Sequence, residues 1–154
     1  MNVGIIVYSG TGNTLSVAQK LQRALSAAGH TAALERVETV GSDPRASGPV
    51  ALKKAPDIAP YDAVIFASPV HAFSLAPAMK LYLGQLSDLS GKKVFCFVTQ
   101  HFKKRWLGGN RAVRQIQAAC RLKNGELSGN GVVNWSSAGR QEQIEDIVTR
   151  LSAL

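Results

Sequence analysis

Apolar residues in this chain gather in short continuous runs, which alternate with longer stretches where apolar positions recur every three or four residues. Continuous runs are typical of strands buried on both faces, and the recurrence is typical of helices with one buried side. Strands are therefore predicted over 3–8, 31–37, 63–67, 94–99 and 132–135. Because helical patterns separate these runs, the sequence predicts an α/β fold with a parallel sheet covered on both faces.

The predicted helices have suitable residues at their ends. The first, which contains Leu21 and Leu25, ends near Gly29, a residue type that often follows the last helical turn. Pro77 suits the first turn of the second helix, and the third begins near Asn110. Apolar positions at 144, 147, 148 and 151 indicate a terminal helix.

Five strands joined by right-handed helical crossovers fit a doubly wound five-stranded parallel sheet in the order 2-1-3-4-5, which is the order expected here. A chain of 154 residues is expected to form one domain, residues 1–154. The partial alternation within 31–37 suits an edge strand. The stretch 38–60 is rich in Gly and Pro and predicts a surface crossover with at most one broken helix, whereas 125–131 is too rich in Gly and Asn to assign.

The loop between the first strand and the first helix, residues 8–14, reads Tyr-Ser-Gly-Thr-Gly-Asn-Thr. Such a loop directs backbone N–H groups and the positive end of the helix dipole at one point, which suits a bound phosphate. No Lys or Arg lies between Asn2 and Ala18, so the loop's own N–H groups and side chains must satisfy the anion. A terminal monophosphate has three oxygens and can use that many donors.

Two other nucleotide-binding loops are disfavoured. The dinucleotide fingerprint Gly-x-Gly-x-x-Gly would have Leu15 at its third glycine. The pattern Gly-x-x-x-x-Gly-Lys-Ser/Thr of nucleoside triphosphate loops occurs nowhere in the chain. An ordinary strand-to-helix turn is the remaining alternative, but a helix cap needs one hydroxyl and this loop supplies three.

The motif Ser9-Gly10-Thr11-Gly12-Asn13-Thr14 resembles the phosphate loop of flavodoxins and flavodoxin-like FMN proteins, whose pattern is Ser/Thr-x-Thr-Gly-x-Thr. The resemblance implies that these six residues hold the phosphate of FMN. Residues 61–70 look like the third strand and flavin loop of flavodoxin-family oxidoreductases, and Thr99-Gln100-His101-Phe102 falls where a second flavin loop begins. The resemblance therefore extends over nearly the whole chain and implies a flavodoxin-like fold.

In a sheet of this order, ligands bind beyond the carboxyl ends of the strands, where the chain switches faces. The loops after the third and fourth strands are expected to meet the phosphate loop there. They carry flat side chains able to pack on a ring system, so a phosphate at one end and a ring at the other match FMN. Besides the six loop residues, the predicted cofactor site comprises Ser68, Pro69, Val70, His71, Ala72, Phe73, Thr99, Gln100, His101 and Phe102.

The formal net charge is +8, and the positive charge is concentrated in one segment. Residues 89–125 contain no acid, and their cations are Lys92, Lys93, Lys103, Lys104, Arg105, Arg111, Arg114, Arg121 and Lys123. One end of the molecule is therefore expected to be strongly positive. This favours an acidic redox partner or an anionic ligand, with nucleic acid only a weak nonspecific companion.

The remaining composition bounds the class of protein. Cys96 and Cys120 fall in different predicted elements without metal or redox spacing, and both are expected to be buried, reduced thiols. No apolar run approaches the roughly 20 residues of a membrane span, and no charged leader with an apolar stretch is seen at the N-terminus. We expect a soluble cytoplasmic protein.

The chain departs from electron-carrier flavodoxins in two ways. Residues 68–74 contain no glycine, whereas the resemblance implies a flavin-loop glycine in such carriers, and the acids expected around the flavin are missing. The resemblance implies an FMN flavoprotein that takes part in electron transfer. The two departures favour, as its more specific form, an NAD(P)H-dependent flavin or quinone reductase, or else a carrier with an acidic partner. Lys103, Lys104 and Arg105 would receive an NADPH phosphate or form a solvated basic loop.

No residue is assigned a catalytic or metal-binding role, because no paired carboxylate, metal cluster or nucleophile triad stands out. His71 is expected either to contact the flavin or to be solvated, and the same holds for His101. An alternative function is a flavodoxin-fold binding module whose basic face engages an acidic protein or nucleic acid. A phosphatase is disfavoured because the chain lacks a Cys-x5-Arg loop.

Overall fold

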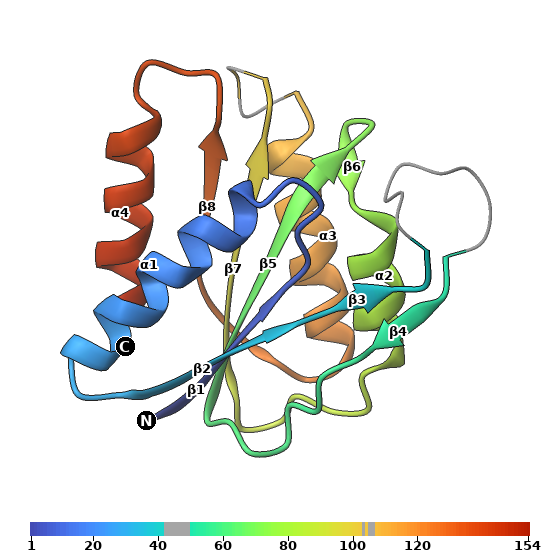
Figure 1. Cartoon of the computed structure of the whole chain (residues 1–154). Coiled ribbons are helices and arrows are strands. Elements are labelled where there is room, and N and C mark those ends of the chain that lie inside the picture. Colours follow the sequence, from blue (N-terminus) through green and yellow to red (C-terminus); the bar gives the residue numbers. More distant parts are fainter. Residues whose placement is uncertain (42–49, 103, 105–106) are drawn as a thin grey trace.

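The computed structural model of the protein describes residues 1–41, 50–102, 104 and 107–154. A parallel five-stranded sheet runs through its centre (Figure 1). In spatial order its strands are β2 (Thr31–Arg36), β1 (Asn2–Val7), β5 (Ala63–His71), β7 (Lys93–Gln100) and β8 (Glu126–Asn134). The predicted order 2-1-3-4-5 is confirmed, and β2 lies at an edge as expected.

Among the residues that the structure describes, four helices cover the two faces of the sheet (Figure 1). Helices α1 (Asn13–Ala27) and α4 (Arg140–Ser152) lie on one face, and α2 (Pro77–Gln85) and α3 (Gly109–Leu122) lie on the other. Side chains alternate along each strand, so Ile5 packs under α1 and α4 while Ile6 packs under α2 and α3. Burial on both faces explains why the inner strands read as continuous apolar runs.

The third predicted strand is longer than the sequence suggested, because β5 continues to His71 and pairs with a short antiparallel strand, β6 (Ser74–Leu75). Most of the expected loop 68–74 is therefore a hairpin. Its two turn residues, Ala72 and Phe73, have φ angles of 49° and 63°. Two positive φ angles define a turn that normally takes Asn and Gly, and each non-glycine residue there costs about 1 kcal/mol or more.

Helix α3 holds this strained hairpin in place. The Gln115 side-chain carbonyl accepts hydrogen bonds from the Leu75 N–H at 2.8 Å and from the Ser74 hydroxyl at 3.0 Å. Gly108, which precedes α3, lies so close to the turn that a Cβ atom there would come within 2.7 Å of the Phe73 Cα. The hairpin is thus fixed against α3, and the Phe73 side chain is half-exposed and stacks on the Phe102 ring.

Two other stretches contain strands that the sequence analysis did not predict. The described parts of 38–60 contain no helix; β3 (Glu38–Thr39) and β4 (Leu52–Lys54) form an antiparallel pair there, and 42–49 lie outside the described residues. Strand β8 begins at Glu126, well before the predicted start at 132. The glycines that obscured it are needed for packing, because a Cβ at Gly131 would come within 2.5 Å of the Ile147 side chain in α4.

Cys96 and Cys120 are both buried and free, as expected. Burial raises the pKa of each thiol to about 12. Over the described ranges, no helix is both long and apolar enough to cross a membrane.

Candidate functional site

Polar groups gather where the strands end. The described residues that are both polar and buried are Thr14, Ser68, Thr99, Gln100 and Asn134. Thr14 belongs to the first turn of α1, and the others lie in the carboxyl-terminal halves of β5, β7 and β8. Buried polar side chains are retained where they hold a structure or serve a ligand. Their position under the mouth of the sheet agrees with the site location expected from the topology.

The loop from Ser9 to Thr14 is held by a side chain rather than by a cation. The Ser9 hydroxyl oxygen accepts hydrogen bonds from the Gly12 N–H at 3.1 Å and from the Leu15 N–H at 3.3 Å. Gly12 forms the N-cap of α1 with a φ of 95°, a conformation that suits glycine. Ser9 therefore fastens the turn through its oxygen, and its hydroxyl hydrogen stays available to donate.

The same loop offers uncommitted backbone donors. Within the described part of the chain, the N–H groups of Gly10, Thr11, Asn13 and Thr14 donate to no protein acceptor. The first N–H groups of a helix lack intrahelical partners by construction, and they carry the positive end of its dipole. The loop is thus equipped to hold an anion of several oxygens without a Lys or Arg.

Thr14 has a structural contact of its own. Its hydroxyl lies 2.7 Å from the hydroxyl of Thr99, and the two side chains are 1% and 3% exposed. This bond joins the start of α1 to the end of β7. The loop and the fourth strand are thereby held in a fixed relation, and the Thr14 hydroxyl is engaged below the surface.

A pocket of about 180 Å³ opens between the phosphate loop and the ends of β5 and β7. Its wall is formed by Gly10, Thr11, Asn13, Pro69, Val70, His71, Thr99, Gln100, His101 and Trp135. Residues from all three predicted loops are therefore brought together. The pocket has room for part of a nucleotide-sized ligand, the rest of which would lie along its open side.

Several predicted residues lie outside this wall. Ser9 instead borders a neighbouring depression with Arg36 and Glu38, and the Ser68 hydroxyl donates to the Pro69 carbonyl at 3.0 Å. Ala72, Phe73 and Phe102 are exposed beyond the pocket. Of the basic loop, only Lys104 is described and it is exposed; Lys103, Arg105 and the neighbouring Trp106 lie outside the described residues.

The wall contains one residue that sequence reasoning missed. Trp135 directly follows β8, and its backbone N–H donates to the Gln100 carbonyl at 2.7 Å. The guanidinium of Arg140 lies 4.9 Å from the centre of the Trp135 ring and donates to the Trp135 carbonyl at 3.0 Å. An aromatic residue just past the fifth strand was the available signal, since this position lies at the same edge as the predicted loops.

Gln100 anchors the floor of the site. Its side-chain N–H groups donate to Asn134 Oδ1 at 2.5 Å and to the Lys104 carbonyl at 2.6 Å. Its side-chain oxygen, Oε1, is buried and has no hydrogen-bond partner within the described structure. A buried acceptor without a partner is costly, so an N–H group of a bound ligand would be a favourable partner for it.

Two histidines add ring surfaces to the pocket, and a buried tyrosine packs against one of them. His71 and His101 line the pocket from β5 and from the segment after β7, respectively. The Tyr8 ring meets the His71 ring edge-on with centroids 6.3 Å apart, and burial raises the pKa of the Tyr8 hydroxyl. In the part of the chain described, no cluster of side chains is suited to hold a metal ion.

Comparison of the sequence with known protein families shows which family this chain belongs to. A family model described as a flavodoxin domain matches residues 4–106, about two thirds of the chain, including the loop 9–14. The chain belongs to the flavodoxin family. No curated protein sequence matches this flavodoxin-family chain.

Solved structures share the fold of this flavodoxin-family protein at low sequence identity. Oxidised Flavodoxin 2 from Bacillus cereus aligns with a TM-score of 0.70 and 20% identity over 99% of this chain and 98% of that one. A flavoprotein in complex with FMN from Lactobacillus acidophilus aligns with a TM-score of 0.65 and 16% identity over 94% of this chain and 97% of that one. The Trp repressor binding protein from Bacillus subtilis aligns with a TM-score of 0.72 and 18% identity over 97% of this chain and 99% of that one.

Proposed function

We propose that this protein binds FMN noncovalently and works in electron transfer. One observation carries the proposal: a single pocket runs from a cation-free loop with uncommitted N–H groups to a wall of histidine and tryptophan side chains. Membership of the flavodoxin family supports it, as does a structural neighbour solved in complex with FMN.

The phosphate of FMN would be held by the loop. The N–H groups of Gly10, Thr11, Asn13 and Thr14 would donate to its oxygens, with the Ser9 and Thr11 hydroxyls as further donors. Donors from a fixed backbone lose little entropy on binding, and the α1 dipole adds attraction. The Thr14–Thr99 bond would keep the loop at a constant position relative to β7.

The ring of FMN would lie toward β5 and β7, where His71, His101 and Trp135 line the pocket. Aromatic and imidazole rings provide flat surfaces for such a group. Gln100 Oε1 would accept a hydrogen bond from a ring N–H, because it is the buried acceptor that lacks a partner in the described structure. When bound, the flavin would supply the redox chemistry, and the chain would supply binding, orientation and charge.

The charge at the β7 side of the pocket would favour the reduced, anionic form of such a cofactor. Between Asp62 and Glu126 the sequence contains one acid, Asp88, which precedes β7 at the opposite end of the sheet. Lys104 and Arg140 lie at the pocket end. Positive charge near a reduced flavin stabilises its negative charge, so the reduction potential is expected to be higher than that of acidic carriers.

NAD(P)H as the electron donor is the more specific form of this proposal. The exposed Lys104 and the basic residues beside it in sequence supply the charge that a nucleotide phosphate needs. A donor that reduced the bound FMN directly would make the protein a flavin or quinone reductase, whereas a protein donor would make it a carrier with an acidic partner.

Absorbance spectroscopy tests the proposal. The purified protein is mixed with FMN, excess cofactor is removed by gel filtration, and NADPH and then dithionite are added without oxygen. Flavin bands that stay with the protein support the function, and bleaching by NADPH supports the reductase form. If no flavin is retained, the cofactor assignment is wrong, and the alternative of a binding module on this fold takes its place.

A further inference from the structure

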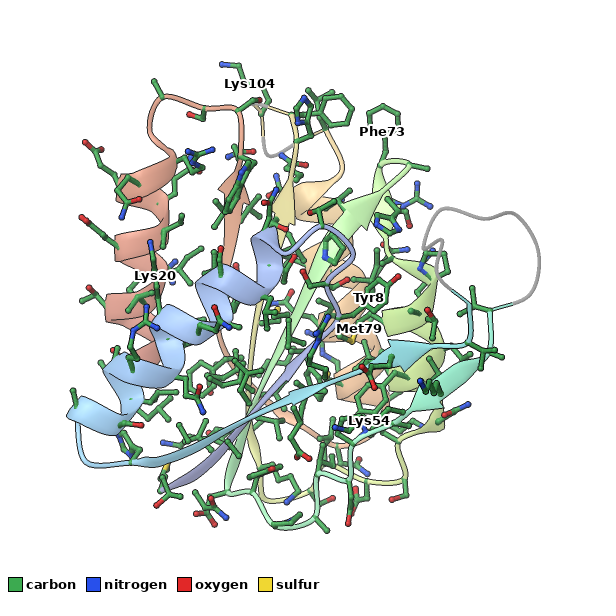
Figure 2. All side chains as sticks on the ribbon, in the orientation of Figure 1. Tyr8, Lys20, Lys54, Phe73, Met79 and Lys104 are labelled. Carbon is green, nitrogen blue, oxygen red and sulfur yellow. The ribbon has the colours of Figure 1, made fainter. Side chains whose placement is uncertain are left out.

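Another cavity lies toward the end of the sheet opposite to the proposed cofactor pocket. Its volume is about 280 Å³, and it opens between the C-terminal end of α2 and the loop 55–58 that follows β4. Figure 2 shows Lys54, the last residue of β4, at the opposite end of the molecule from Lys104 and Phe73, which lie at the pocket end. This α2 cavity is therefore separate from the proposed flavin pocket, and the proposed function makes no use of it.

The wall of the α2 cavity combines an apolar floor with a polar rim. Its buried members are Pro56, Ile58, Tyr82 and Leu86, and its exposed members include Asp57 and Gln85. The Tyr82 hydroxyl donates to the Pro56 carbonyl at 2.6 Å, so the loop is fastened to the helix and the floor is formed before any ligand binds. A preformed apolar floor suits the hydrocarbon part of a ligand.

The rim of the α2 cavity carries negative charge and hydrogen-bond acceptors. Asp57 Oδ1 accepts a hydrogen bond from the Ala59 N–H at 3.0 Å, and no cation among the described residues forms an ion pair with this carboxylate. Helix α2 ends at Gln85 without a basic residue in its last turn, and the carbonyls of Gly84 and Gln85 accept no hydrogen bond within the described chain. The negative end of the α2 dipole is thus uncompensated at a cavity that also contains a carboxylate.

These surroundings are unusual for a chain whose formal net charge is +8. Burial, and after it the charges of Glu35 and Asp57, raise the pKa of the Tyr82 hydroxyl, because negative charges disfavour a phenolate. The nearest cations in the sequence, Lys54 and Lys80, are exposed and are not part of the wall. The charged residue of the wall is therefore an acid, although cations outnumber acids in the chain as a whole.

We propose that the α2 cavity binds a small organic cation, an aryl-alkyl primary amine. The ammonium group would pair with the Asp57 carboxylate and lie at the negative end of α2. The aromatic body would cover the apolar floor, which includes the edge of the Tyr82 side chain. The proposal does not depend on FMN binding, because the two sites share no residue.

Other classes of ligand fit the α2 cavity less well. A phosphate or a carboxylate would meet the Asp57 charge and the negative end of α2. A bare metal ion would lack ligands, because the described residues contain no group of three carboxylate, imidazole or thiol side chains suited to hold one. A neutral hydrocarbon would cover the floor but would make no use of the carboxylate.

A titration with 2-phenylethylamine tests the site. The amine is added to the ¹⁵N-labelled protein, with and without FMN, and the amide chemical shifts are followed. We expect a dissociation constant of about 1 mM and shifts centred on residues 55–58 and 82–87. Ethylamine has the charge without the ring, and 3-phenylpropionate has the ring with the opposite charge. Each of these should bind at least about tenfold more weakly.

Matched substitutions separate the charge of the wall from its fold. Asp57→Asn keeps an oxygen that can accept from the Ala59 N–H, so the affinity for the amine should fall about tenfold while the melting temperature stays the same. Asp88→Asn changes a carboxylate in the same kind of turn, because Asp88 Oδ1 accepts from the Ser90 N–H at 3.1 Å. Asp88 is not part of the cavity wall, so the affinity of this control should stay within about twofold.

A cation introduced at the end of α2 gives an independent test. Gln85→Lys places a positive charge on the rim, so it should weaken binding of 2-phenylethylamine about tenfold. The melting temperature should not fall, because a cation suits the C-terminal end of a helix. Gln19→Lys adds the same charge at an exposed position of α1, across the sheet, and should change the affinity about twofold or less.

Three results would overturn the amine site. They are shifts that appear only above about 20 mM amine, equal affinity for 3-phenylpropionate, and unchanged affinity in both Asp57→Asn and Gln85→Lys. Tighter binding of Nα-acetyl-lysine amide would overturn the assignment of a small amine in favour of a lysine side chain of a partner protein. Loss of FMN binding with intact amine binding would overturn the proposed function alone.

Discussion

Removal of one hydroxyl beneath the pocket should destabilise the protein more than removal of both. Thr14 and Thr99 are 1% and 3% exposed, and their hydroxyl oxygens lie 2.7 Å apart. Thr99→Val keeps the shape of the side chain but leaves the Thr14 hydroxyl buried without this partner. An orphaned buried hydroxyl costs about 1–3 kcal/mol, so each single variant should lower the unfolding free energy by about that amount.

The double variant Thr14→Val with Thr99→Val leaves no orphaned group. Replacement of both partners by apolar groups of the same shape is nearly neutral, so its loss should be about 1 kcal/mol or less, well below the sum of the single losses. Because 1 kcal/mol shifts the melting temperature of a chain this size by about 2–4 °C, the difference is measurable. Thr149→Val, an exposed position on α4, serves as the control and should change stability by less than about 0.5 kcal/mol.

Urea unfolding of the FMN-free protein, followed by circular dichroism, measures these four variants. Strong non-additivity supports a direct hydroxyl pair that joins α1 to β7. Single variants that each lose less than about 0.5 kcal/mol, or a double variant that loses the full sum, would refute this reasoning.

Three further predictions concern other parts of the fold. Gly4→Ala should lower the unfolding free energy by about 2 kcal/mol, because its Cβ would come within 2.4 Å of the Tyr61 ring, whose hydroxyl donates to Glu35; a thermal melt unchanged by the substitution would be inconsistent with this contact. Gly12→Ala has open space but a φ of 95°, so it should cost about 1 kcal/mol of stability, and a smaller loss in Gly12→Asn, which tolerates this region, is the check. The two buried thiols, with a pKa of about 12 each, keep protons that the unfolded chain releases from about pH 8.5. Their contribution to stability is therefore fully present below that pH and is lost as the pH rises above it. The free energy of unfolding should fall by up to about 1.4 kcal/mol per pH unit for each thiol. Urea unfolding between pH 8 and 11 under reducing conditions should show a steeper decline for the wild type than for Cys96→Ala with Cys120→Ala, and equal slopes would argue against that origin.

The parallel sheet could be predicted because the inner strands are apolar on both faces, and the order 2-1-3-4-5 is one of the common orders that right-handed crossovers allow. The start of β8 could not, because Gly129 and Gly131 suggest a loop in sequence but serve close packing of α4 in space. The β5–β6 hairpin was missed for a related reason. Its turn residues, Ala72 and Phe73, give no turn signal, and the contacts that hold them come from α3, far along the chain.

The site was predictable to the extent that local sequence determines it. The loop 9–14 carries its own chemistry, and the topology brings it to the ends of β5 and β7. Trp135 was not predicted as a site residue, because its position in the pocket wall depends on where β8 ends and on the contact with Arg140. The different roles of the loop hydroxyls could not be predicted either, since the hydrogen bond between Thr14 and Thr99 joins residues that are 85 positions apart in the sequence.

The affinity of the protein for FMN compared with riboflavin tests the central claim most directly. The two ligands share the ring and differ in the phosphate, which the loop 9–14 is proposed to hold. Fluorescence titration should show FMN binding at least about 100-fold tighter than riboflavin, since several charge-assisted hydrogen bonds would be lost with the phosphate. Equal affinities for the two ligands, or binding of neither, would contradict the account.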